Sequence, residues 1–182
     1  MTRVGITGHS NLTADSAPLV ADALRAKLAA HVSGGLVGVS CLARGADQIF
    51  ARVVLELGGA LEVVLPAADY RSRKVTVEDA AVFDELMGHA TTVRTLPFET
   101  SNRESYLGAS EHLLSTAELM VAVWDGEPAD GRGGTGDVVE RARALGLPVT
   151  VVWPVGAARE VGVRQRPKAS DTRAADLCRR QG

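Results

Sequence analysis

Short apolar runs alternate with amphipathic patterns along almost the whole chain, and this alternation restricts the fold more than any other feature. Most runs are continuously apolar, which is typical of parallel strands that helices cover on both faces. We predict strands over Arg3–Thr7, Leu36–Cys41, Leu61–Leu65, Thr91–Leu96, Leu119–Trp124 and Val149–Trp153. The helical patterns between them cover Ser16–His31, Ala46–Leu57, Val77–Met87, Arg103–Glu118 and Gly136–Leu145. The sequence therefore predicts an α/β protein with a doubly wound, mostly parallel sheet and helices on both of its faces.

Residues typical of helix ends support these boundaries. Thr76 stands directly before a helical pattern, where its hydroxyl oxygen can accept a hydrogen bond from a backbone N–H of the first turn. Glycines follow several of the helical patterns, at the position where a left-handed residue often ends a helix. These glycines are Gly34-Gly35, Gly58-Gly59, Gly88 and Gly146.

The length of 182 residues fits one domain, which we expect to cover residues 1–155. Residues 156–182 hold seven Lys and Arg against three Asp and Glu, so we expect a basic and flexible C-terminal tail there. The whole chain carries a formal charge of −2, which makes the predicted domain acidic. An acidic domain does not favour a broad nucleic-acid-binding surface, for which a strongly basic face is expected.

The cysteine pattern and the hydropathy indicate a cytoplasmic protein. Cys41 and Cys178 are far apart in the chain, so a disulfide framework is not expected. The N-terminus does not resemble a signal peptide, and no apolar segment approaches the roughly 18 residues that a membrane span requires. We therefore expect no membrane association.

In open parallel sheets, ligands bind beyond the carboxyl ends of the strands, close to the point where the strand order reverses. The most informative loop of this kind follows the run that ends in Trp124-Asp125-Gly126, and it leads to Gly133-Gly134-Thr135-Gly136. Glycines allow a close approach to the backbone, and a helix that starts here offers unpaired N–H groups to a phosphate. Trp124 can stack on a base, and Asp125 can orient a ribose or act as a general base.

Two further loops carry candidate binding residues. Thr7, Gly8, His9 and Ser10 follow the first strand and combine a tight turn with two hydroxyl donors. Arg44, Gly45 and Asp47 follow the second strand, where Arg44 can pair with an anion and Asp47 can bind a ribose hydroxyl.

Structural roles remain open for several of these residues. The first loop can be a plain strand-to-helix turn, Trp124 can belong to the core, and Asp47, Asp137 and Glu140 can complement helix dipoles. No Cys/His cluster has metal-ligand spacing, and the motifs of P-loop proteins and of α/β-hydrolases are absent, so we expect no metal and no cofactor.

Taken in order, these motifs resemble those of the SLOG superfamily, which comprises Rossmann-like proteins related to the Lonely Guy phosphoribohydrolases and to DNA-processing protein A. The resemblance covers about residues 3–154. The run from Ser40 to Asp47 is similar to a motif of the DNA-processing branch, and Gly133 to Thr135 is similar to part of the Lonely Guy motif. That motif has a catalytic Glu three residues after its Thr, where this chain has Val138.

The resemblance implies a module that binds a nucleotide or nucleotide derivative, acts as a sensor with a separate effector protein, and forms a homodimer. The alternative is an enzyme that hydrolyses the N-glycosidic bond of a nucleoside 5′-monophosphate, with Asp125, Asp137 and Glu140 as candidate catalytic carboxylates. Single-stranded nucleic acid is not the favoured ligand, because the predicted domain is acidic and only 4% of residues are aromatic. The identity of the base and the number of phosphates stay open.

Overall fold

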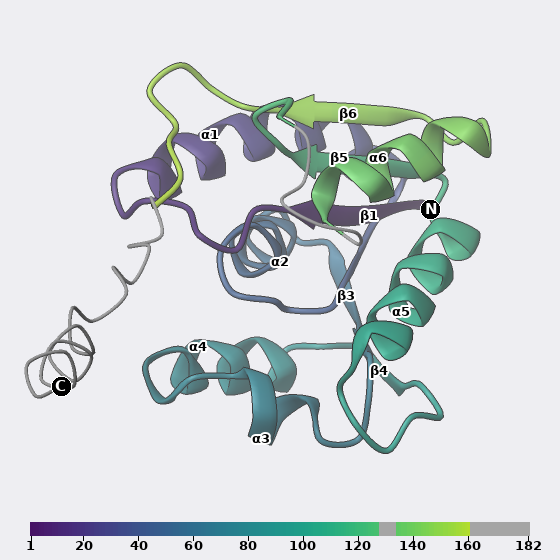
Figure 1. The fold of residues 1–182 in the computed structure, drawn as a ribbon. Coiled ribbons are helices and arrows are strands. Elements are labelled where there is room, and N and C mark those ends of the chain that lie inside the picture. The colour runs from purple at the N-terminus through teal and green to yellow at the C-terminus, as the bar shows by residue number, and fades with distance from the viewer. Residues whose placement is uncertain (128–133, 161–182) are drawn as a thin grey trace, which may run out of the picture.

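The computed structural model describes residues 1–127 and 134–160. Six parallel strands form one sheet in the order β4-β3-β2-β1-β5-β6 (Figure 1). The strands are β1 (Thr2–Gly8), β2 (Leu36–Ser40), β3 (Ala60–Leu65), β4 (Thr92–Thr95), β5 (Leu119–Val123) and β6 (Val149–Val152). The helices are α1 (Ser16–Leu28), the 3-10 helix η1 (Ala29–Gly34), α2 (Ala46–Glu56), α3 (Tyr70–Lys74), α4 (Val77–Gly88), α5 (Arg103–Thr116) and α6 (Thr135–Ala144).

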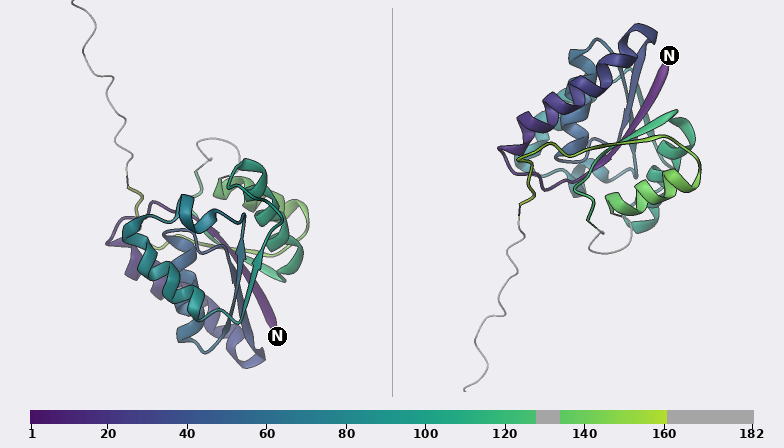
Figure 2. Two further views of the ribbon diagram at one scale, coloured as in Figure 1. Left: turned by 90° about the horizontal axis from the view of Figure 1, so that it is seen from below. Right: turned by 90° about the horizontal axis from the view of Figure 1, so that it is seen from above.

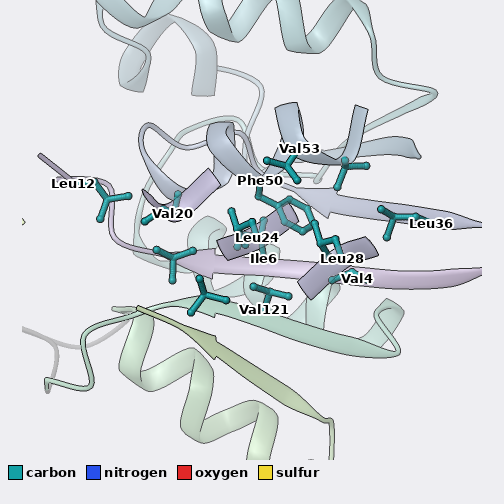
Figure 3. Packing of buried hydrophobic residues seen from close by; sticks show 14 residues of the cluster. Val4, Ile6, Leu12, Val20, Leu24, Leu28, Leu36, Phe50, Val53 and Val121 are labelled. Atoms are coloured by element: carbon teal, nitrogen blue, oxygen red, sulfur yellow. The ribbon is translucent and has the colours of Figure 1, made fainter. Parts of the chain in front are cut away.

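Helices cover both faces of the sheet, as both views of Figure 2 show. On one face, Leu24 of α1 and Phe50 of α2 pack with the buried strand residues Val4 and Ile6 (Figure 3). The helix α4 extends this layer through a second apolar cluster that includes Phe83. On the opposite face, α5 packs on β2 and β3, and α6 packs on α5 and β5. The predicted Rossmann-like α/β class and its doubly wound sheet are therefore confirmed.

Two details of the predicted helices differ from the structure. The short helix α3 was not predicted, because five residues are too few to show a helical period. Gly88 was predicted to end its helix in the left-handed conformation, and this prediction is wrong: Gly88 is the last residue of α4, and the N–H of His89 donates to Glu85 O without a left-handed residue. Gly35, with a φ of 84°, does adopt the predicted conformation.

The segment after β6 returns to the loop between β1 and α1 (Figure 1). Leu12 and Arg159 form an isolated antiparallel bridge. The N–H of Thr13 donates to Ala158 O at 3.0 Å, and the N–H of Glu160 donates to Asn11 O at 2.6 Å. Residues 156–160 of the predicted tail therefore contact the sheet domain, and residues 161–182 lie outside the described part of the chain.

Across residues 1–127 and 134–160, no helix is both long and apolar enough to cross a membrane.

Candidate ligand-binding site

The strand order reverses at β1, which has β2 on one side and β5 on the other. The chain leaves β1 through α1 on one face of the sheet and enters β5 from α5 on the opposite face. The two connections therefore diverge at this edge of the sheet and leave a crevice beyond the carboxyl ends of the strands. A cavity of about 460 Å³ lies there, lined by the ends of β1 and β5 and by the start of α6.

The cavity brings together most of the predicted binding residues from three separate loops. An apolar wall that includes Tyr106 and Leu113 of α5 faces the same space. The predicted residues that line the cavity are Thr7, Gly8, His9, Ser10, Asp47, Trp124, Gly134, Thr135 and Gly136. These loops carry hydroxyl groups and the N-terminus of α6, so the cavity lining combines polar groups suited to an anion with an apolar surface.

Gly8 and Gly45 allow these loops to approach one another. A Cβ on Gly8 would lie 2.5 Å from the Cβ of Ala46, the first residue of α2. Gly45 has a φ of 81°, and a Cβ there would lie 2.7 Å from His9 O. Both contacts are too short for a side chain, so the glycines are required where the start of α2 packs against the end of β1.

Asp125 lies at the end of β5 and is the centre of a polar cluster. The ring of His9 donates from Nε2 to Asp125 Oδ1 at 3.0 Å, and the N–H of Glu127 donates to the same oxygen at 3.1 Å. Arg159 Nε forms an ion pair with Oδ2 at 2.7 Å. Burial raises the pKa of Asp125, but the bonds from Glu127 and His9 and the charge of Arg159 outweigh it and lower the pKa below its ordinary value.

The contact with Asp125 also orients His9. A neutral imidazole that donates from Nε2 has its second nitrogen, Nδ1, as an acceptor. The ring is packed edge-on against Trp153, with the centroids 5.6 Å apart, and its side chain is only 11% exposed. His9 is therefore held in one orientation at the cavity wall.

Asp47 is buried and supports the loop after β2. Its Oδ2 accepts hydrogen bonds from Ser40 Oγ at 3.1 Å and from the N–H of Cys41 at 3.2 Å. Burial raises the pKa of Asp47 to about 6, although these bonds and one from the N–H of Ala43 lower it. The loop includes Leu42 with a φ of 54°, a conformation that is unfavourable for a leucine. Asp47 thus stabilises a strained loop at the edge of the cavity.

The other predicted site residues lie apart from this cavity or outside the described chain. Arg44 is exposed, with Asp79 and Glu160 at 3.8 Å and 3.7 Å from its guanidinium. Asp137 and Glu140 are exposed on α6, and Glu140 lines neither of the two cavities at this end of the molecule. The structure therefore does not gather the three predicted catalytic carboxylates around one space. Gly126 forms a turn with a φ of 85° directly after Asp125, and Gly133 lies outside the described residues.

Arg159 and Tyr106 line the cavity without having been predicted as site residues. Arg159 follows the last strand, and no local pattern signals that its segment returns to β1. Apart from the ion pair with Asp125, its side chain has no hydrogen bond or ion pair with any residue that the structure describes. Tyr106 packs on Tyr70, with the ring centroids 6.3 Å apart.

No family model matches the sequence, and no curated protein sequence matches it. Solved structures do match. One of them is DNA processing protein A from Helicobacter pylori, whose structure addresses its single-stranded DNA binding mode. It superposes with a TM-score of 0.61 at 18% identity, and the match covers 87% of this chain and 68% of that one. The same protein from Streptococcus pneumoniae gives 0.60 at 18% identity, over 83% of this chain. This chain spans half the length of the Streptococcus pneumoniae protein.

A molybdenum cofactor binding protein from Rippkaea orientalis gives a TM-score of 0.53 at 12% identity, over 82% of this chain and 75% of that one. This chain has the Rossmann-like fold of these proteins. This fold agrees with the one that the resemblance to the SLOG superfamily implies. Because two of these neighbours are DNA processing proteins, they do not support the expectation that nucleic acid is an unlikely ligand.

Within the described ranges, no group of three or more His, Cys, Asp or Glu could hold a metal ion. Burial raises the pKa of the Cys41 thiol, so this cysteine at the cavity wall stays protonated and is a poor nucleophile.

Proposed function

We propose that this protein binds a nucleotide or nucleotide derivative in the cavity between β1, β5 and α6. The observation that supports this most directly is the combination of a helix N-terminus and hydroxyl groups with an apolar wall in one ligand-sized space. The phosphate would lie at the start of α6, near Thr135, and the base would lie against Tyr106 and Leu113. The volume of about 460 Å³ is within the range of small-molecule sites.

Arg159 would supply a positive charge to the phosphate. Asp125 contacts its Nε, and the two terminal nitrogens have no bond to the described residues. A guanidinium held in this way can still offer two N–H donors to a phosphate, with little further loss of side-chain freedom. We propose that Asp125 acts here as a positioning residue for Arg159 and His9.

The same proposal treats the molecule as a sensor or binding module. The separate effector protein, the homodimer and the cytoplasmic location stay predictions. Recognition of the ribose by Asp47 also stays a prediction. A ribose hydroxyl would have to compete with the hydrogen bonds that Asp47 already accepts from Ser40 and Cys41.

The test is isothermal titration of the protein with AMP, ADP, ATP, NAD and adenosine, together with chromatography of each mixture after incubation. We expect a phosphorylated ligand to bind and to be recovered intact. Arg159→Ala should weaken that binding by about tenfold or more and leave the affinity for adenosine unchanged. Arg25→Ala is the matched control, because Arg25 lies on α1 with Asp22 and Glu56 and lines neither cavity.

No binding of any nucleotide would contradict the proposal. Release of free adenine and ribose phosphate would instead establish the hydrolytic alternative. In that case Asp125, Asp137 and Glu140 would be the residues to replace next.

A further inference from the structure

A second cavity, of about 480 Å³, adjoins the first one between α5, α6 and the end of α3. The two cavities share Tyr106, Ser110 and Val138 in their walls, so they meet along this line of residues. The helices α5 and α6 lie side by side (Figure 2), and Arg141 Nε donates to Glu111 Oε1 at 3.1 Å across them. The binding crevice therefore continues past the space that a single nucleotide needs.

The lining of the second cavity, like that of the first, combines apolar residues with positive charge. Leu107 is 46% exposed and Leu114 is buried, and both line the cavity. Lys74 and Arg103 also line the cavity, and neither forms an ion pair with any acid in residues 1–127 or 134–160. Lys74 Nζ lies 5.7 Å from the ring centroid of Tyr106.

The N-terminus of α5 adds to this positive potential. Asn102 and Arg103 begin the helix at the cavity, and the partial positive charge of a helix N-terminus favours an anion. The acids in the wall are Glu111, which pairs with Arg141, and Asp137. Of the basic residues that line the cavity, Arg141 is paired with an acid, whereas Lys74 and Arg103 have no ion pair with a described residue.

We propose that the second cavity is a second nucleotide subsite, and that the ligand is a linear dinucleotide whose two units lie on either side of Tyr106. Lys74 and Arg103 bind the phosphate of the second unit, and Leu107 and Leu114 contact its base. This inference rests on the proposed function for the first cavity and adds the length of the ligand.

The experiment compares AMP with the dinucleotide pApA by isothermal titration. The dinucleotide should bind at least about tenfold more tightly than AMP, because it gains charged hydrogen bonds and apolar contact in the second cavity. Lys74→Ala and Arg103→Ala should each lower the affinity for pApA several-fold and leave the affinity for AMP unchanged. Lys27→Ala is the control, since Lys27 is exposed on α1 and lines neither cavity.

The outcomes separate this inference from the proposed function. Equal affinity for AMP and pApA, or loss of pApA binding in the control variant alone, overturns the second subsite while the first one stands. Failure of AMP, pApA and every other nucleotide of the first titration to bind refutes the proposed function together with this extension. An affinity that rises a further tenfold from pApA to an adenylate hexamer overturns the two-unit ligand in favour of single-stranded nucleic acid.

Discussion

Replacing Asp47 by Asn should remove a pH-dependent contribution to stability that this carboxyl group makes through its burial. The side chain is 7% exposed, and its pKa of about 6 in the folded protein lies above the ordinary value of 3.8. A carboxyl group whose pKa is higher in the folded protein than in the unfolded chain stabilises the fold fully only while it is protonated in both the folded and the unfolded state. That contribution is complete below pH 3.8 and is lost as the pH rises through 6.

The size of the effect follows from the two pKa values. Each pH unit between them corresponds to about 1.4 kcal/mol, so the ionised group costs the folded protein about 3 kcal/mol at neutral pH. Because the unfolded chain is already partly ionised at pH 4, about 2 kcal/mol of this loss should fall between pH 4 and pH 8. An amide at position 47 can accept the bonds from Ser40 and Cys41 through its oxygen and has no such titration.

The assay is urea unfolding of the natural protein and of Asp47→Asn at intervals from pH 4 to pH 8. As the pH rises from 4 to 8, the unfolding free energy of the natural protein should fall by about 2 kcal/mol relative to that of Asp47→Asn. All other titrating groups are common to the two proteins, so their effects cancel in this difference. A flat difference for Asp47→Asn would refute the reasoning, because it would show that the group ionises as easily in the fold as in the unfolded chain.

Three further substitutions test contacts of the site and its supports. Gly45→Ala should lower the unfolding free energy by about 2 kcal/mol or more, because an alanine is strained at a φ of 81° and its Cβ would lie 2.7 Å from His9 O. Urea unfolding measures this loss, and an unchanged midpoint would contradict the prediction. Asn102→Ala should cost about 1 kcal/mol in the same assay, since the side chain accepts from Ser105 N in a capping box, and Asn102→Ser should restore most of it. Asp125→Asn should weaken AMP binding in titration calorimetry without preventing folding, because Arg159 and His9 lose the carboxylate charge that holds them. An unchanged affinity for AMP would exclude the positioning role of Asp125.

The sequence predicts the secondary structure and the fold class well, since both depend on local patterns. Short apolar and β-branched runs identify all six strands, although β4 includes an arginine, and the polar side of α5 carries Glu104 and Glu111 in exposed positions. Thr76 was predicted to begin α4, and its hydroxyl does accept from the N–H of Asp79 at 3.3 Å. These features need only the neighbouring residues in the chain.

The strand order and the roles of individual residues depend on contacts that are distant in sequence. Every predicted strand is followed by a plausible loop, and only the order of the strands in the sheet selects those after β1 and β5 as the walls of the cavity. Arg159 reaches the site through a bridge to Leu12, which lies far away in the chain. A residue pattern cannot predict such a contact, because nothing local to Arg159 differs from an exposed arginine.

Asp125 shows how these distant contacts change the chemistry that a residue can perform. A general base works best when its pKa lies near the working pH, whereas the partners of Asp125 lower its pKa below that of an ordinary aspartate. Both carboxylate oxygens are also occupied, Oδ1 by His9 and Glu127 and Oδ2 by Arg159. To take a proton from water, the group would first have to give up one of these contacts. The geometry at the end of β5 therefore favours an aspartate that holds the side chains of Arg159 and His9 in place over one that removes protons.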